Sequence, residues 1–109
     1  MEVHLDDRSP FRVVRLSGDV DLHSSPRARQ AILDCLRAGS PVLVDLSGVS
    51  YMDSSGVASL VEGYQLARKT RVEFGLAAAS APVLNVLRLA RLDQVFPIHP
   101  SVEDRLSRG

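Results

Sequence analysis

A chain of 109 residues, 45% of them hydrophobic, is long enough for one domain with a modest core and too short for two. Its 13 basic and 13 acidic residues give a formal net charge of zero, which argues against a nucleic-acid binder, because such proteins usually carry a basic excess. The single cysteine, Cys35, excludes an intrachain disulfide and is expected on the buried face of a helix. We therefore expect one domain over residues 1–109, with its core at about 11–106.

The first third of the chain predicts a β-hairpin followed by a helix. Residues 2–6 and 11–17 are rich in β-branched and apolar types, and a Ser-Pro turn separates them. Ser25, which precedes a proline, is expected to cap a helix that Gly39 ends.

Strands and helices alternate in the rest of the chain. Residues 42–46 form a nearly continuous apolar run, typical of a strand covered on both faces. The remaining expected elements are a helix with an apolar stripe after Gly56, a strand at 72–78, a helix from Ser80, a short strand at 95–98 and a helix at 102–106. The order ββαβαβαβα predicts an α/β fold with a mostly parallel sheet that starts with a β-hairpin.

Notable polar side chains occur in three loops that follow predicted strands. They are Asp19 and Asp21 in the first loop, Asp53, Ser54 and Ser55 in the second, and Ser80 in the third. The carboxyl ends of parallel strands share one edge of a sheet, so we expect these loops to converge there.

The turn Asp53-Ser54-Ser55-Gly56 has two interpretations. Asp53 is a good N-cap, and a purely structural role explains this residue well. The unpaired N–H groups and the positive dipole end of a helix start also form an anion site, where a phosphate on Ser54 could be accommodated. On spacing alone, a functional turn and an ordinary helix cap are about equally supported.

Enzymatic alternatives lack essential residues. Asp19-Val20-Asp21 is similar to the motif of phosphoaspartate-forming phosphatases, which need a longer chain and a downstream lysine, and Lys69 falls near a helix end instead. A receiver domain would use Asp45 as its phosphorylated residue, but the lysine that it needs at the end of a late strand is absent.

Hydrolase, nucleotide and metal motifs are also missing. The chain has no Gly-x-Ser-x-Gly motif and no Gly-x-x-x-x-Gly-Lys motif. Its three histidines, His4, His23 and His99, match neither a catalytic serine nor a metal site. We therefore expect a protein that is not an enzyme and has neither a metal nor a cofactor.

Four segments, in the same order, resemble STAS domains of the bacterial anti-sigma factor antagonist type. Their sequences are LSGDVD at 16–21, VLVDLSGV at 42–49, YMDSSGV at 51–57, and a stretch that runs from ASAPV at 79–83 to LARLDQVF at 89–96. The resemblance covers about residues 11–106. Residues 69–71 depart from it, because many relatives have a glycine in this loop.

The resemblance implies a function and a site. Such a domain binds an anti-sigma factor with a serine-kinase fold and thereby frees a sigma factor. The kinase phosphorylates the serine after the motif aspartate, which is Ser54 here, and a phosphatase resets the switch. Ser55 would support Ser54, and Asp21 matches the family's acidic residue near the phosphorylated serine. The expected partner contacts are Asp19, Asp21, Asp53, Ser55 and Gly56.

A second function stays open at this point. STAS domains also serve as accessory subunits of phospholipid ABC transporters, in which the same turn contacts the ATPase subunit beside the permease. The start of the chain lacks the pattern of a signal peptide, and no apolar run approaches the ~20 residues of a membrane span. The sequence therefore predicts a cytoplasmic protein without direct membrane insertion.

Overall fold

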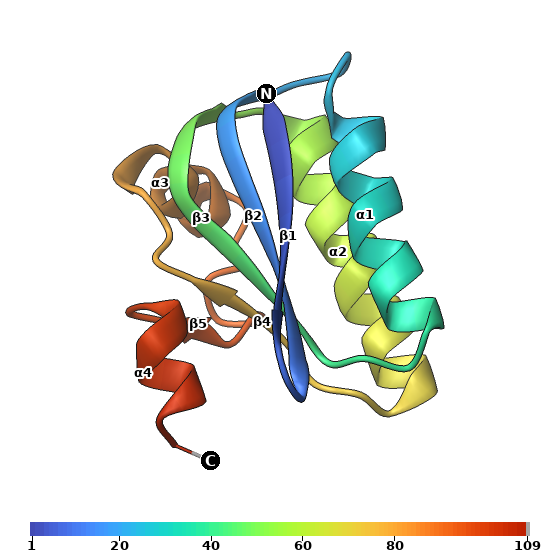
Figure 1. Ribbon diagram of the computed structural model, residues 1–109. Helices are drawn as coiled ribbons and strands as arrows, with labels where there is room; N and C mark the ends of the chain where they lie inside the picture. The colour runs from blue at the N-terminus through green and yellow to red at the C-terminus, as the bar shows by residue number, and fades with distance from the viewer. Residues whose placement is uncertain (109) are drawn as a thin grey trace.

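The computed structural model describes residues 1–108, whose strands and helices follow the predicted order (Figure 1). The elements are β1 (Glu2–Arg8), β2 (Phe11–Val20), α1 (Ser25–Arg37), β3 (Val42–Met52), α2 (Ser54–Thr70), β4 (Phe74–Ala77), α3 (Ala81–Leu89), β5 (Ile98–His99) and α4 (Val102–Leu106). The predicted α/β fold class is confirmed.

The strands form one sheet in the order β1-β2-β3-β4-β5. β1 and β2 pair antiparallel across a two-residue turn, as the hairpin pattern predicts. From β2 onward every pair is parallel, and the connection from each strand to the next contains a helix. The carboxyl ends of β2, β3 and β4 therefore lie at the same edge of the sheet.

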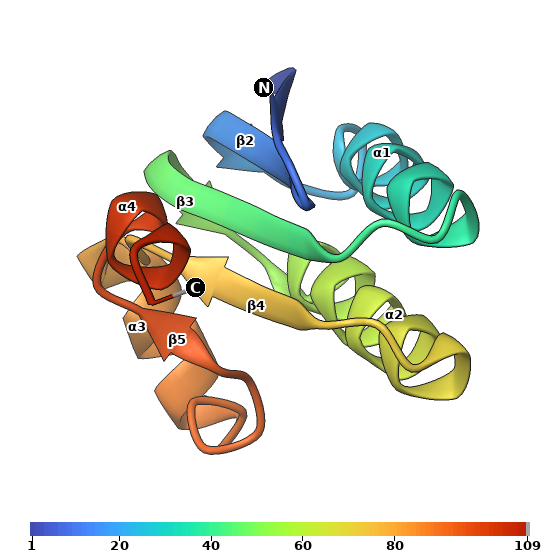
Figure 2. The same ribbon diagram turned by 60° about the horizontal axis from the view of Figure 1, so that its bottom comes forward.

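The helices cover both faces of the sheet. α1 and α2 lie side by side over one face, where buried residues of β2 and β3 such as Val14 and Val44 form the main core with them (Figures 1 and 2). α4 lies on the other face, where Val102 and Leu106 pack against a small buried cluster. That cluster consists of Phe11, Val13 and Leu43. Cys35 is buried on α1 as predicted, and burial raises the pKa of its thiol.

β3 is longer than the sequence predicts. It continues to Met52, whereas the apolar run ends at residue 46. Two register shifts in the pairing with β2, between Arg15 and Ser17 and between Gly18 and Asp19, absorb extra residues of β3. These shifts allow the polar second half of β3 to stay paired with β2, and the pairing continues to the last residue of both strands.

Two predicted boundaries differ from the structure. Ser24, and not Ser25, is the N-cap of α1, and Ser25 is the buried first residue of the helix. The last strand is β5 rather than 95–98, because the N–H groups of Val95 and Phe96 bond to the carbonyl of Leu92 in a turn. The ring of Phe96 leaves the sheet edge and enters the core. Among residues 1–108, no helix has the length and apolar character to cross a membrane.

Gly63 fixes how closely α2 packs on the rest of the domain. A Cβ atom at this position would lie 2.8 Å from Cγ2 of Ile32 on α1 and 2.9 Å from Cε1 of Phe74 at the start of β4. Both neighbours are buried and stiff, so neither can move without disturbing the core. A side chain at position 63 would therefore push α2 away from α1 and the sheet.

We expect Gly63→Ala to destabilise the domain although alanine is the better helix former. Alanine gains about 1 kcal/mol over glycine in a helix interior, whereas overpacking a core costs about 1–3 kcal/mol. The net loss, about 1 kcal/mol, would lower Tm by about 4 °C or more in a thermal melt. Gln65→Ala, at an exposed position of the same helix, is the control and should leave Tm nearly unchanged. A Gly63→Ala variant that melts higher than wild type would contradict this packing.

Candidate functional site

The turn after β3 is tied to the end of β2. Val20 and Met52, the last residues of these strands, pair in register, and the N–H of Asp53 donates to the carbonyl of Val20 at 3.1 Å. This bond confirms that the first two polar loops meet at one edge of the sheet, which is at the top in Figure 1. The third loop contacts β3 before the end of the strand, because the hydroxyl of Ser80 donates to the carbonyl of Val49 at 2.7 Å.

Asp53 caps α2 with its carboxylate, as the sequence predicts. Its backbone is extended, and Oδ1 accepts from the N–H groups of Ser55 at 2.9 Å and Gly56 at 3.2 Å. The hydroxyl of Ser55 donates to the same oxygen at 2.5 Å. These bonds lower the pKa of Asp53. The bond from the Ser55 hydroxyl has the largest effect, and the N–H of Leu22 contributes as well.

The cap changes one sequence-based expectation. We expected unpaired N–H groups at the start of α2 that could hold an added phosphate. The N–H groups of Ser55 and Gly56 instead bond to Asp53, so the chain's own carboxylate takes the place of an external anion. A phosphate on the neighbouring Ser54 would lie beside that carboxylate.

The two serines of the turn have different surroundings. Ser54 is exposed, and its hydroxyl has no hydrogen-bond partner within residues 1–108. Ser55 is half-buried, and its hydroxyl is used by Asp53. Of these two hydroxyls, that of Ser54 is the one that an enzyme or a partner can reach without breaking the helix cap.

Gly56 lets α2 begin close to the strand ends. A Cβ atom here would lie 2.6 Å from Cγ of Met52 and 3.0 Å from Cγ1 of Val20. The residue is buried beneath the turn, so it acts on the site by positioning Ser54 and Ser55.

Asp19 and Asp21 lie on either side of Val20, whose carbonyl holds the turn. Asp19 is exposed and accepts from the hydroxyl of Ser50 at 2.9 Å. Asp21 is half-buried, and its Oδ1 accepts from the N–H groups of His23 and Ser24, both at 3.0 Å. Bonds from Ser24 are the main cause of the lowered pKa of Asp21, whose immediate role is to order the start of α1.

The site is acidic and has no paired cation. Among the ion pairs of residues 1–108, none includes Asp19, Asp21 or Asp53. Asp45 is not part of the site: it lies within β3, 3.3 Å from Nε of Arg15. The described part of the chain, which ends at 108, also has no group of His, Cys, Asp and Glu side chains suited to a metal ion.

Two exposed apolar side chains near the turn were missed by the sequence analysis. Leu22, in the loop after β2, is 72% exposed, and Tyr51, at the end of β3, is 51% exposed. Leu22 stands out in the sequence as the one large apolar residue between Asp21 and Ala28. Exposed apolar residues beside a polar turn are typical of a protein contact surface.

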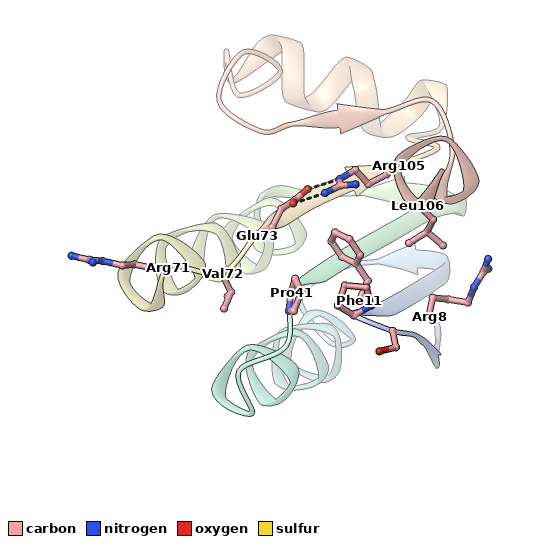
Figure 3. A pocket seen from close by; sticks show the side chains of 10 residues that line it. Arg8, Phe11, Pro41, Arg71, Val72, Glu73, Arg105 and Leu106 are labelled. Carbon is pink, nitrogen blue, oxygen red and sulfur yellow. Dashed lines mark hydrogen bonds and ion pairs between the residues drawn. The ribbon is translucent and has the colours of Figure 1, made fainter. Parts of the chain in front are cut away.

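A pocket of about 630 Å³ lies at the opposite edge of the sheet (Figure 3). Phe11 and Val72 line it at the amino ends of β2 and β4, and Glu73 forms a bidentate ion pair with Arg105 across it. The guanidinium of Arg105 lies 4.8 Å from the centre of the Phe11 ring. The turn at Ser54 does not line this pocket, so the candidate site is a surface and not a cavity.

The comparisons with known proteins agree with this geometry. The model of the STAS domain family matches residues 2–105. The chain is 24% identical to the anti-sigma F factor antagonist of Paenibacillus polymyxa over 109 residues, which cover 98% of this chain and 93% of that protein.

Solved structures of anti-sigma factor antagonists have the same fold. The crystal structure of one from Mycobacterium paratuberculosis superposes with a TM-score of 0.87 at 29% identity, covering 98% of this chain and 92% of that one. The phosphorylated form of the Bacillus cell fate determinant SpoIIAA superposes with a TM-score of 0.79 and covers 98% of both chains. Its identity of 21% supports likeness of fold alone.

We expect Asp53→Ala to lower Tm at neutral pH, because the variant loses the cap of α2 and the anchor of Ser55. A lowered carboxyl pKa stabilises the folded state above the unfolded pKa of about 4, and this contribution is lost as the pH falls through the folded pKa. The difference in Tm between wild type and variant should therefore be largest near neutral pH and shrink in acid. Asp19→Ala, which removes one exposed bond, is the control; an equal effect of both variants would contradict the special role of Asp53.

Proposed function

The chain belongs to the STAS domain family, and on that premise we propose that it is an anti-sigma factor antagonist that phosphorylation of Ser54 switches off. The observation that carries the proposal is the exposed, unbonded hydroxyl of Ser54 at the first position of α2. Relatives named anti-sigma factor antagonists support the regulatory class.

The proposed partner is an anti-sigma factor with a serine-kinase fold, and binding to it frees the sigma factor. The partner would contact the exposed turn, with Leu22 and Tyr51 as apolar anchors beside Ser54. Asp19, Asp21 and Asp53 would form the polar rim of this contact, and Ser55 and Gly56 would hold Ser54 in position. An apolar centre with a polar rim is the usual arrangement of protein interfaces.

Phosphate would switch the contact electrostatically. A phosphoserine adds a charge of about −1.5 to −2 at neutral pH. Among residues 1–108, no ion pair includes Asp19, Asp21 or Asp53, so the added charge would meet carboxylates that no cation neutralises. Burying an unpaired charge in an interface typically costs about 2–5 kcal/mol, which weakens binding roughly 30- to 3,000-fold.

The same modification would leave the domain folded. The cap of α2 depends on the carboxylate of Asp53 and the hydroxyl of Ser55, and not on the hydroxyl of Ser54. In the free protein a phosphate on Ser54 would remain exposed to water. A phosphatase could therefore remove it from a folded chain and restore binding.

We predict that Ser54→Asp weakens binding to the anti-sigma factor of the same genome at least 30-fold, while Ser54→Ala binds at wild-type affinity and cannot be switched off. Isothermal titration calorimetry measures both affinities. Ser80→Ala is the control, since Ser80 bonds to β3 away from the turn. Unchanged affinity in both Ser54 variants would refute the switch.

A kinase assay tests the phosphorylation itself. Incubation with the anti-sigma factor and ATP, followed by mass spectrometry, should place one phosphate on the peptide that contains Ser54, and none on that peptide in Ser54→Ala. Phosphate on Ser55 would contradict the assignment. Tight binding to the ATPase subunit of a phospholipid transporter, without phosphate transfer, would instead support the second function that the sequence left open.

We predict that Leu22→Ser lowers the affinity for the same anti-sigma factor roughly 10-fold or more, because a buried leucine contributes about 1.5–3 kcal/mol. Leu89→Ser is the matched control: Leu89 is 87% exposed, but it is the last residue of α3 and lies in none of the three polar loops. Calorimetry distinguishes the two variants. Equal affinities for Leu22→Ser and Leu89→Ser would exclude Leu22 as an anchor.

A further inference from the structure

β1 leaves one side of the sheet open. It is an edge strand that pairs only with β2, and in an antiparallel pair alternate residues bond to the neighbour. The N–H and C=O groups of the other residues of β1 therefore point away from the sheet. Within residues 1–108, no backbone group outside the hairpin bonds to β1. An edge of this kind can accept another strand.

The side chains of β1 have an ordered pattern. Glu2, His4, Asp6 and Arg8 share one face of the strand, since successive side chains alternate. On this face the strand begins with an acid and ends with a base. Leu5 lies on the other face and is 51% exposed, which is unusual for a large apolar residue at a sheet edge.

We propose that β1 pairs antiparallel with β1 of a second copy of this chain, in the register that places Leu5 opposite the same residue of that copy. In this register Glu2 lies opposite Arg8 and His4 lies opposite Asp6. A two-fold axis repeats each pair, so complementary polar pairs line one face, and the other face has a central pair of leucines between two Val3–Asp7 pairs. The contact joins two sheets into one.

Neighbouring registers are less favourable. A shift of one residue places Glu2 opposite Asp7, and the opposite shift places Leu5 opposite Asp6. Shifts of two residues place Glu2 opposite Asp6, or Asp6 opposite the same residue of the second copy. A parallel, in-register pairing would place every charge opposite its own copy. Like charges directly opposite each other destabilise a sheet, and a one-residue shift places residues with outward-pointing backbone groups opposite residues that already bond to β2, so the sequence of β1 selects one register.

Arg8 can serve both its own chain and the second copy. Its Nη1 and Nη2 atoms donate to the carboxylate of Glu103 at 2.8 and 3.1 Å. A guanidinium has five N–H donors, so three remain for the carboxylate of Glu2 from the other chain. The pairing therefore extends an ion pair that already exists and does not need to break it.

The association stops at two copies. The other edge of the sheet is β5, which has only two residues and offers little backbone to pair with. The proposed contact uses the side of the sheet, whereas Ser54 lies at the carboxyl edge of its strands. Both copies therefore keep an exposed Ser54, and the proposal does not depend on the function proposed for that residue.

Sedimentation equilibrium over a wide range of protein concentration tests the pairing. The mass should rise from 11.9 kDa toward twice that value as concentration increases. Glu2→Lys places two bases opposite each other and Arg8→Glu two acids, so each variant alone should dissociate roughly 10-fold more readily. Asp7→Lys is the matched control with the same charge change as Glu2→Lys, because Asp7 lies opposite the uncharged Val3.

A mixture of the two variants gives the sharpest outcome. In a mixed dimer the new lysine lies opposite the new glutamate, and the native Arg8 lies opposite the native Glu2, so native mass spectrometry should find the mixed dimer and little of either homodimer. Leu5→Glu, which keeps the ion pair of Arg8, should also dissociate. Circular dichroism confirms that each variant folds. A mass of one chain at all concentrations, or a mixture that does not pair, would overturn the proposal.

Discussion

The site depends on one carboxylate that is bonded in two directions. The backbone N–H of Asp53 attaches the turn to the last residue of β2, and its side chain accepts from two N–H groups and a hydroxyl at the start of α2. One residue thus sets the distance from sheet to helix and the direction in which the helix leaves. Asp53 and Ser55 bond to each other, so the hydroxyl of Ser54 is needed neither to attach the turn to β2 nor to cap α2.

Local pattern was sufficient to predict most of the fold. Apolar residues at helical spacing predicted α2, and the alternation of strands and helices predicted a parallel sheet. The length of β3 could not be predicted, because Ser47 and Gly48 interrupt its apolar run and only the irregular pairing with β2 keeps the strand intact. The position of β5 was predicted wrongly because of tertiary packing. The residues around Phe96 are typical of a strand, but its ring packs edge-on against that of Tyr64, with 5.5 Å between the ring centres.

The candidate site was predicted in part. Asp53 as the helix cap follows from residue type and position, and the choice of Ser54 over Ser55 came from the resemblance to STAS domains. The hydroxyl environments support the same choice on physical grounds. The exposure of Leu22 beside the turn could not be foreseen, because it depends on how the loop after β2 folds against the turn. Such contacts join residues far apart in the sequence and leave no periodic signal.

The close packing of Gly56 has a consequence for comparing relatives of this chain. Any side chain there would overlap Met52, and a residue at 53 without a side-chain oxygen acceptor would leave the helix start unsatisfied, whatever the protein does. Selection for a stable fold is therefore enough to preserve Gly56 and a capping residue at 53. Position 54 has no such structural role. Under the switch proposed for Ser54, a homologue that keeps Asp and Gly but replaces the serine between them would retain the scaffold without the switch, so this single column of an alignment would separate regulated members from silent ones.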